Sequence, residues 1–261
     1  MSLIHPEQVE LTGNHNVSRA SVLDIFRADR GRSVLRIPIS ERRRQIESIP
    51  WVEQAVVRRA LPHTLQVEIV ERIPIAFLRD GSDMALIDVH GVILDRPLQG
   101  RLHFPVVTGI NSDMSLDERE KRMQLFADFL LQLDSARAGA VEEVSEVDLS
   151  DANDLRASLT GLQTVGAAAA NSAAGNSSES WGDSDAPILV HFGDSDFETK
   201  YETLIDKMAQ WRVTAGRVES VDMRFDGQVV VNSDTPAVAR VQKQAAPQKR
   251  TASAGAGKHK R

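Results

Sequence analysis

The chain has 261 residues, of which 41% are hydrophobic and 26% are charged, as in soluble globular proteins. Its 31 basic and 37 acidic residues give a formal net charge of −6, a balance that gives no support to a nucleic-acid role. The absence of cysteine excludes disulfides, thiolate metal sites and a cysteine nucleophile. Uninterrupted apolar runs never exceed four residues, so no segment of this sequence is expected to span a bilayer.

Charge is distributed unevenly along the chain. Residues 1–111 hold 14 arginines, no lysine and 13 acidic residues, whereas residues 112–232 hold 10 basic and 23 acidic residues. Residues 233–261 hold seven basic residues and one acidic residue, so we expect a disordered basic tail, either solvated or in contact with an anionic surface. Residues 163–186 include 17 Ala, Ser, Gly or Asn among 24 and are expected to form a flexible surface insertion.

The first part of the chain shows strand patterns on both sides of two helix patterns. Val9–Asn14 is predicted to be a short strand that ends in a Gly-Asn turn. Two helices should follow, the first capped by Ser18 and the second by Ser40. Trp51–Arg59 and Thr64–Glu71 are then predicted to form an antiparallel hairpin, because apolar residues alternate cleanly along its second strand. These elements predict a three-stranded sheet covered on one face by two helices.

The second part is predicted to be mostly strands with two flanking helices. A capping box formed by Ser115 and Glu118 opens the first of these helices, and the second begins near Asp196 with an apolar stripe along one side. The predicted strands are Val144–Leu149, Leu155–Leu159, Ile188–Phe192, Val218–Phe225 and Gln228–Asn232. The last two flank Asp226-Gly227, a pair that favours a two-residue hairpin turn. The whole chain is therefore expected to have an α+β fold.

Sequence motifs for catalysis are weak. Phe192-Gly193-Asp194-Ser195 looks superficially like the nucleophile block of GDS-type hydrolases, but the only histidine after Ser195 is His259, in the predicted tail, so a general base is missing. The seven histidines show no metal-binding spacing, and no glycine-rich phosphate loop is present. We expect no catalytic residue, no metal site and no cofactor, and the default interpretation is a binding protein.

Five ordered motifs resemble the FtsQ/DivIB bacterial cell-division family. They are Val9-Glu10-Leu11-Thr12-Gly13-Asn14; Ile49-Pro50-Trp51-Val52 with Ala55, Val57, Arg59, Pro62, Thr64 and Leu65; Glu71-Arg72-x-Pro74-x-Ala76; Leu86-Ile87-Asp88-x-x-Gly91; and Pro105-Val106-Val107-Thr108-Gly109. The closing pattern Val221-Asp222-Met223-Arg224-Phe225 is also similar to the end of that family's second domain. One departure is Leu61, which stands where relatives often carry an aromatic residue.

The resemblance implies a division of the chain into a POTRA domain of β-α-α-β-β order and a mostly antiparallel β domain with two flanking helices. On this interpretation residues 1–8 are a linker after a missing membrane helix, residues 9–78 are the POTRA domain and residues 79–232 are the β domain. The resemblance also implies a single-pass protein of the bacterial cytoplasmic membrane, with this region on the outer side at the division septum. It would act as a non-enzymatic scaffold that binds FtsB- and FtsL-like proteins, and other division proteins through the POTRA domain, to help regulate septal peptidoglycan synthesis.

Two sets of site residues are hypothesised. The last predicted strand has no later strand to cover its outer side, and an exposed strand edge is a template for an added strand. The candidate partner-binding residues are therefore Phe225, Gln228, Val229, Val230, Val231 and Asn232. The alternative is that Phe225 and the valines are core residues and that the chain's own tail covers the edge of the strand. Glu71 and Arg72 are either ordinary surface charges or a latch between the two domains.

A second function from another class stays open at this point. POTRA domains also occur in proteins that receive translocating polypeptides for outer-membrane assembly or secretion. Such receivers precede a barrel with many aromatic-rich strands, whereas only 5% of this chain is aromatic and it ends in basic residues.

Overall fold

The computed structural model describes residues 8–96, 102–162, 186–215, 217–225 and 228–233. The helices and strands are β1 (Val9–Thr12), α1 (Arg19–Ile25), η2 (Arg27–Asp29), η3 (Val34–Arg36), α2 (Ile39–Glu47), β2 (Val52–Ala60), β3 (Thr64–Glu71), β4 (Pro74–Asp80), β5 (Asp83–Asp88), β6 (Ile93–Leu94), β7 (Val106–Thr108), α3 (Leu116–Ala136), η4 (Ala140–Glu143), β8 (Val144–Asp151), β9 (Asp154–Leu159), β10 (Ile188–Gly193), α5 (Phe197–Ala215), β11 (Val218–Phe225) and β12 (Gln228–Ser233). The expected insertion at 163–186 and the expected tail at 233–261 lie almost entirely outside the described residues. The predicted α+β fold is confirmed.

The first sheet has the strand order β1-β3-β2, with β1 parallel and β2 antiparallel to β3. Alternation along β3 points Leu65, Val67 and Ile69 to one face, where α1 and α2 cover them. This face forms its own buried cluster, to which Val22 of α1 and Ile46 of α2 contribute. The predicted hairpin and its two covering helices are therefore present.

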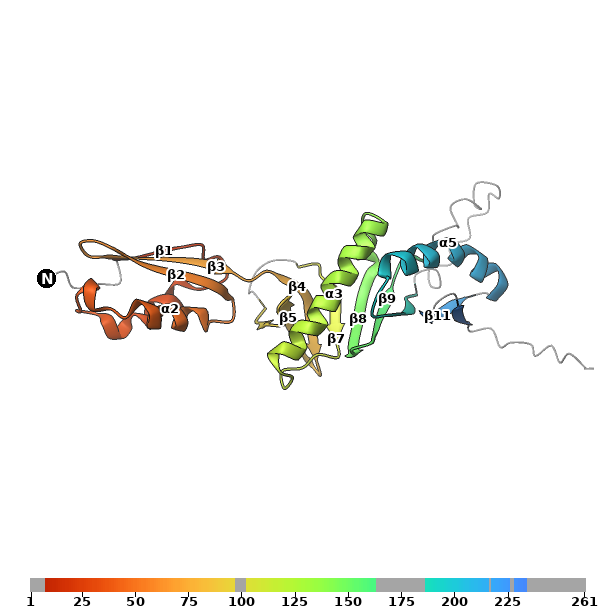
Figure 1. Ribbon diagram of the computed structural model, residues 1–261, viewed down its shortest axis with the longest axis horizontal. Helices are drawn as coiled ribbons and strands as arrows, with labels where there is room; N and C mark the ends of the chain where they lie inside the picture. The colour runs from red at the N-terminus through yellow and green to blue at the C-terminus, as the bar shows by residue number, and fades with distance from the viewer. Residues whose placement is uncertain (1–7, 97–101, 163–185, 216, 226–227, 234–261) are drawn as a thin grey trace, which may run out of the picture.

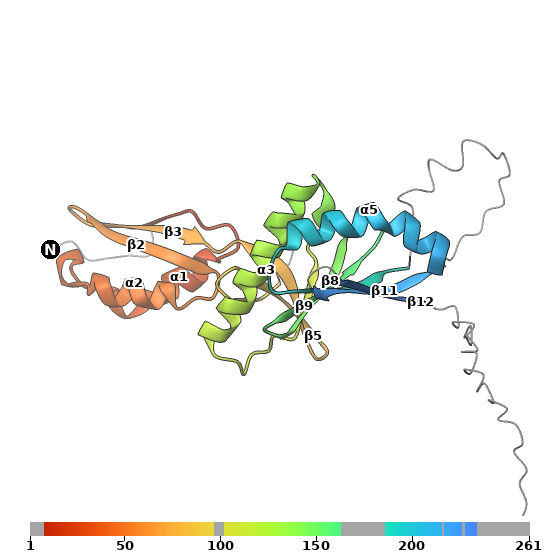
Figure 2. The same ribbon diagram turned by 45° about the vertical axis from the view of Figure 1, so that its right-hand side comes forward.

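The second sheet has nine strands in the order β12-β11-β10-β9-β8-β7-β4-β5-β6. Most neighbouring pairs are antiparallel, but β10–β11, β7–β8 and β4–β7 are parallel. Helices α3 and α5 lie side by side over one face of this sheet (Figures 1 and 2). The two sheets follow one another along the long axis of the molecule, so β12 lies far from the first sheet.

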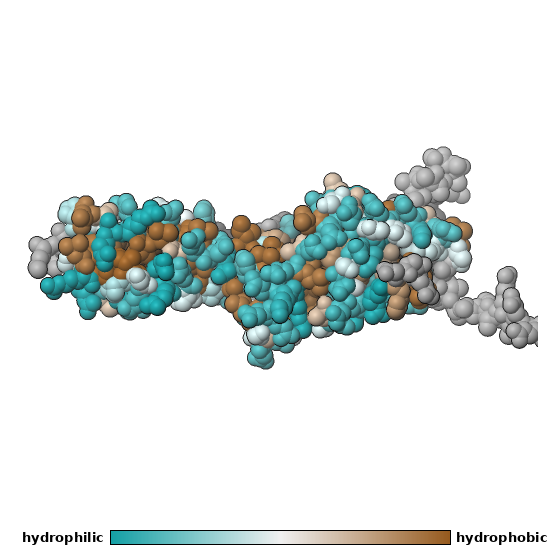
Figure 3. Space-filling view, in the orientation of Figure 1, coloured by the Kyte–Doolittle hydropathy of each residue, from teal (hydrophilic) through white to brown (hydrophobic). Residues whose placement is uncertain are grey.

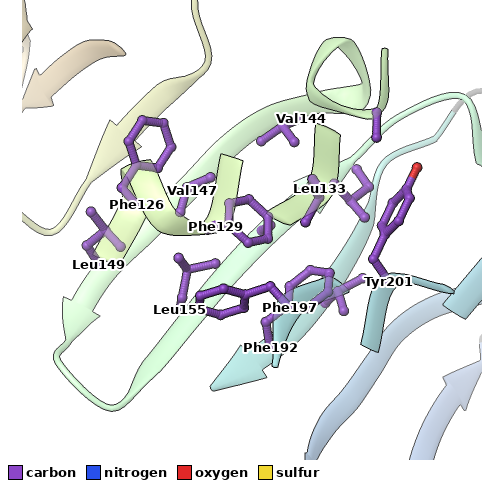
Figure 4. Packing of buried hydrophobic residues seen from close by; sticks show 14 of the residues in the cluster. Phe126, Phe129, Leu133, Val144, Val147, Leu149, Leu155, Phe192, Phe197 and Tyr201 are labelled. Carbon is purple, nitrogen blue, oxygen red and sulfur yellow. The ribbon is translucent and has the colours of Figure 1, made fainter. Parts of the chain in front are cut away.

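The core of the second sheet contains a cluster of aromatic side chains between α3, α5 and the strands. The Phe129 ring of α3 packs edge-on against Phe192 of β10 and Phe197 of α5, with ring centroids 5.1 Å and 5.3 Å away (Figure 4). Leu133, Val147 and other residues shown there are fully buried around these rings. Edge-to-face packing of this kind stabilises a sheet–helix interface beyond simple area burial. The edge strands are consequently built on a rigid support.

Two local predictions need correction. We expected the first domain to extend to residue 78, but β4 begins at Pro74 and pairs with β5 and β7, so the change from one sheet to the other falls between Glu71 and Pro74. We also expected Ser40 to cap the second helix, whereas α2 begins one residue earlier, at Ile39, after Pro38. Pro38 has a fixed φ of −78° and starts the helix without a side-chain cap.

Candidate partner-binding edge

The last strand lies at one end of the nine-stranded sheet. β12 pairs antiparallel with β11, and β11 pairs on its other side with β10. Within the described part of the chain, no strand pairs with the outer side of β12. Its outward N–H and C=O groups are therefore arranged to accept an added strand.

The candidate residues divide between the core and the surface. Phe225, at the end of β11, is 56% exposed, and Val230 of β12 is 40% exposed. Val229 and Val231 are partly buried and pack against the core, as expected for the opposite face of the strand. Asn232 donates from Nδ2 to Ser220 Oγ at 3.1 Å, which fixes the end of the β11–β12 ladder. Gln228 pairs with Phe225 in the backbone register. The arrangement brings all six residues to one hairpin.

A groove of about 620 Å³ runs between α5 and this hairpin. Its apolar lining includes Trp211, Met223, Phe225 and Val229, and its basic lining includes Lys200 and Lys207. The Nζ of Lys200 donates to the carbonyl oxygens of Phe192 and Ser195, both at 2.7 Å, so its charge is held at the start of α5. A peptide on the β12 edge would thus have a groove beside it whose apolar lining is flanked by two lysines and the acidic Asp196.

The buried carboxylate of Asp154 binds side chains from the strands at this end of the sheet. Asp154 of β9 is 2% exposed, and its Oδ2 accepts from Arg156 Nε at 2.8 Å, lies 2.9 Å from His191 Nδ1 and lies 3.4 Å from Arg224 Nη1. Arg224 also donates through Nη2 to Asp222 at 2.6 Å. The guanidinium of Arg224 therefore joins β9 to β11, one residue before Phe225.

The charges in this cluster shift the ionisation of its carboxylates. Burial raises the pKa of Asp154, but hydrogen bonds from Arg156 and His191, with the charge of Arg224, outweigh burial and leave the pKa below its ordinary value. The hydrogen bond from Arg224 lowers the pKa of Asp222. Asp222 in turn raises the pKa of Arg224. Both carboxylates are therefore charged, and bound to arginine, at neutral pH.

The two residues of the hypothesised latch have different partners. The Glu71 carboxylate accepts from the backbone N–H groups of His15, Asn16 and Val17 at 2.6–2.9 Å, so it closes the first sheet onto the loop before α1. Burial raises the pKa of Glu71, and these backbone hydrogen bonds lower it further than burial raises it. Glu71 thus belongs to the first sheet alone.

Arg72 forms an ion pair between the two sheets. Its Nη1 donates to Asp88 Oδ2 at 2.8 Å, and its backbone N–H donates to Trp51 O at 2.9 Å. Asp88, at the end of β5, is 2% exposed and also accepts from the N–H groups of His90 and Val92. Trp51 Nε1 adds a second link, donating to Asp95 O at 3.2 Å. The structure therefore brings together Arg72 and Asp88, not Glu71 and Arg72.

Three features considered from the sequence can be followed in the described residues. Ser195 lies on the surface with its Oγ donating to Asp194 Oδ1 at 3.3 Å, and no described histidine bonds to it. Within the residues whose placement is described, no group of three or more His, Cys, Asp or Glu could hold a metal ion. None of the helices in the same residues is long and apolar enough to cross a membrane.

Sequence reasoning missed two parts of the site. Trp211 continues the apolar stripe of α5, but it is only partly buried and lines the groove. A second periodic stripe was the available signal, because Lys200, Thr203, Lys207 and Trp211 follow one another at helical spacing. The Asp154 cluster had no such signal, since its histidine and its second arginine are 37 and 70 residues away in sequence.

Comparison with known proteins covers nearly all of the described chain. Residues 4–72 match the family model "POTRA domain, FtsQ-type", and residues 76–224 match "Cell division protein FtsQ/DivIB, C-terminal". FtsQ of Koribacter versatilis is 31% identical over 231 residues, which are 88% of this chain and 60% of that protein. FtsQ of Syntrophotalea carbinolica is 24% identical over 236 residues, which are 87% of this chain and 73% of that protein. The chain thus spans about 60% of the length of the Koribacter relative.

A solved structure is also similar, although weakly. The major extracytoplasmic domain of DivIB from Geobacillus stearothermophilus shares 15% identity, with a TM-score of 0.24, over 34% of this chain and 71% of that one. The two family models each name the FtsQ or FtsQ/DivIB family. They therefore favour the cell-division family over the polypeptide-receiving alternative. Because the second model alone covers more than half of the sequence, this chain belongs to the FtsQ/DivIB family of bacterial cell-division proteins.

Proposed function

We propose that this chain is the extracytoplasmic part of a non-enzymatic division scaffold, held by a single-pass anchor in the cytoplasmic membrane. It binds FtsB- and FtsL-like proteins and so helps to regulate septal peptidoglycan synthesis. Membership of the family supports the division role. The observation that carries the binding mechanism is the outer side of β12, with which no described strand pairs, next to the exposed Phe225.

The physical argument separates affinity from selectivity. Backbone hydrogen bonds from β12 to an added strand are independent of sequence and supply affinity. A partly exposed aromatic ring at the end of the edge hairpin is the kind of residue that dominates interface energies. Arg224, whose guanidinium carbon lies 5.6 Å from the centre of the Phe225 ring, restricts that ring before the partner arrives. Less conformational freedom is then lost on binding.

The first test truncates the aromatic ring. Phe225→Ala should weaken binding of soluble FtsB- and FtsL-like segments from the same organism at least tenfold, as measured by isothermal titration calorimetry. The melting temperature should change little, because Phe225 is 56% exposed. Leu131→Ala is the matched control, since Leu131 is 67% exposed on α3 and lies away from the edge. Unchanged affinity in Phe225→Ala would remove this residue from the interface.

The second test targets the strand edge itself. Proline scanning of Gln228–Asn232 removes one backbone N–H at a time. At least one variant should keep the native circular-dichroism spectrum and melting point and yet lose partner binding, because half of the N–H groups of an edge strand point away from the sheet. If every folded variant binds normally, the edge is not the site.

A further inference from the structure

A strongly basic end of the first sheet has no role in the function proposed above. Residues 27–38, which contain η2 and η3, and residues 58–63, which contain the end of β2 and the β2–β3 turn, are called the arginine tip here. The tip holds six arginines, one histidine and a single acidic residue, Asp29. Asp29 is fully buried and accepts from Arg42 Nε at 2.6 Å, so it adds no negative charge to the surface. The rest of the chain is acidic enough to give a net charge of −6.

Several of these arginines are not used inside the protein. The side chains of Arg30 and Arg36 are exposed and form no hydrogen bond or ion pair with the described residues. Arg32 approaches Asp29 only at 3.5 Å, and that carboxylate already belongs to Arg42. The region contains arginine and no lysine, and a guanidinium binds two oxygens of a phosphate at once. The tip therefore presents unused phosphate-binding groups.

Two exposed leucines lie among the arginines. Leu35 of η3 is 68% exposed, and Leu61 of the β2–β3 turn is 69% exposed. The Arg59 side chain holds their segments together, because Nε donates to Val34 O at 2.9 Å and Nη2 donates to Ile37 O at 2.6 Å. Apolar side chains surrounded by arginine are typical of surfaces that enter the headgroup region of a membrane.

The tip also lies at a suitable end of the molecule. Figures 1 and 2 show it at the end of the first sheet that is farthest from the second sheet. Figure 3 shows hydrophobic residues exposed among hydrophilic ones at this end. The described chain enters the first sheet there as well, because Val9 pairs with Leu65, just after the β2–β3 turn.

We propose that the arginine tip binds the surface of a bilayer that contains anionic phospholipid. Arg30, Arg32 and Arg36 contact lipid phosphates, while Leu35 and Leu61 enter the layer below the headgroups. The arginines of the tip come from two neighbouring segments that surround the two leucines. A bilayer offers partners for both kinds of side chain, because its phosphates bind arginine and the apolar layer beneath them accepts leucine. Residues 112–232 hold 10 basic and 23 acidic residues and are repelled by the same surface, so contact through the second sheet is disfavoured.

The test is sedimentation of the full chain with phosphatidylcholine vesicles that contain either no phosphatidylglycerol or 30 mol%, about a third of the lipid. The chain should bind only the anionic vesicles, and less at high salt. Arg30→Gln/Arg36→Gln should weaken binding about 25-fold, or about fivefold for each arginine removed from the surface. Lys121→Gln/Lys207→Gln removes the same charge from α3 and α5 and is the matched control. All variants keep the basic residues 233–261, so that segment contributes equally throughout.

A second pair of variants separates entry into the bilayer from attraction to its surface charge. Leu35→Ser/Leu61→Ser should weaken vesicle binding about tenfold, because two apolar side chains no longer enter the layer. The control, Leu116→Ser/Leu131→Ser, changes two exposed leucines of α3 and should bind like the parent chain. Dependence on the arginines but not on the leucines would show that headgroup charge alone attracts the chain, with no entry of Leu35 and Leu61 into the layer, and would overturn the proposal. Equal losses in the lysine control would overturn it too.

The vesicle test and the test of the division role are independent. Arg30→Gln/Arg36→Gln should bind FtsB- and FtsL-like segments with unchanged affinity, because the tip and β12 lie at opposite ends of the molecule. Failure of partner binding in the parent chain would leave the vesicle result intact. Circular-dichroism melting of every variant checks that the exposed substitutions have not unfolded the first sheet.

Discussion

At the scale of single residues, Asp154 shows how one buried charge can organise an exposed surface. Its carboxylate faces Arg156, His191 and Arg224, which come from three strands. A buried charge is tolerated only when it is paired and hydrogen-bonded, and removal of one partner leaves the others uncompensated. Asp154 therefore positions Arg224, and through it the aromatic ring beside the edge.

Replacement of Asp154 should be costly for stability. Asp154→Asn keeps the shape of the side chain but removes the charge, and we expect the free energy of unfolding to fall by about 2–3 kcal/mol, since the arginine partners are partly solvated. Urea denaturation measures the change. Asp206→Asn, at an exposed position on α5, is the control and should stay within about 0.5 kcal/mol of the parent chain.

The same residue predicts a pH dependence. Because the pKa of Asp154 is lower in the folded state, its contribution is fully present above the ordinary carboxyl pKa of about 4 and is lost as pH falls through the lowered value. The stability difference between the parent chain and Asp154→Asn should be largest near neutral pH and should shrink below about pH 4. A difference that persists unchanged at pH 2.5, roughly 1.5 units below the ordinary value, would show that charge is not its cause.

At the scale of elements, the connection between β3 and β4 is the joint of the molecule. Arg72 lies in this short connection and binds Asp88, which is itself fixed by the N–H groups of the following turn. Gly91 in that turn has φ +73°, and a Cβ there would lie 2.7 Å from the backbone N of Glu120 in α3, so the turn packs directly against the helix. The angle between the sheets is thereby tied to the position of α3.

Loss of the Arg72 ion pair should loosen this joint without unfolding either sheet. The chain has no cysteine, so spin labels can be placed at Ser40→Cys and Ser135→Cys without background labelling. In Arg72→Gln the distance distribution between the labels should broaden in double electron–electron resonance. Arg79→Gln, which removes an ion pair with Glu146 inside the second sheet, is the control. Equal widths in both variants would exclude a latch at Arg72.

Elements with a local signal could be predicted from the sequence, and elements made by distant residues could not. Alternation in Thr64–Glu71 and the Ser115 cap depend on neighbours within a few residues, and both are found as expected. The domain bound expected at residue 78 differs from the change of sheet, because no local pattern in Pro74–Asp80 says that this strand joins the second sheet. Neither the nine-strand order nor the Asp154 cluster has any local signature.

At the scale of the whole molecule, the two sheets have separate cores. The buried cluster of the first sheet and that of the second share no residue. Among the described residues, hydrogen bonds from Arg72 to Asp88 and from Trp51 to Asp95 join the two units. Such a small polar contact transmits little stabilisation, so the two units should unfold in separate steps.

Calorimetry can test this independence. Leu65→Ala removes a fully buried side chain from the first core and should lower the stability of that unit by about 3 kcal/mol, with the second transition unchanged. Leu155→Ala should do the reverse, because Leu155 is fully buried in the second core. A single transition that shifts equally in both variants would mean that the chain unfolds as one cooperative unit.

The strand order also sets the distance between the open edge of β12 and the first sheet. β4 is joined to the first sheet, and six steps of about 4.8 Å separate it from β12, so the open edge stands about 29 Å farther out. The nine residues of β2 add about 30 Å, since the two sheets follow one long axis. If the arginine tip binds a membrane, β12 lies about 60 Å from the membrane surface, and a partner must extend over that distance to reach it. For a continuous helix that is about 40 residues. Partner segments of the wrong length would miss the edge whatever their sequence.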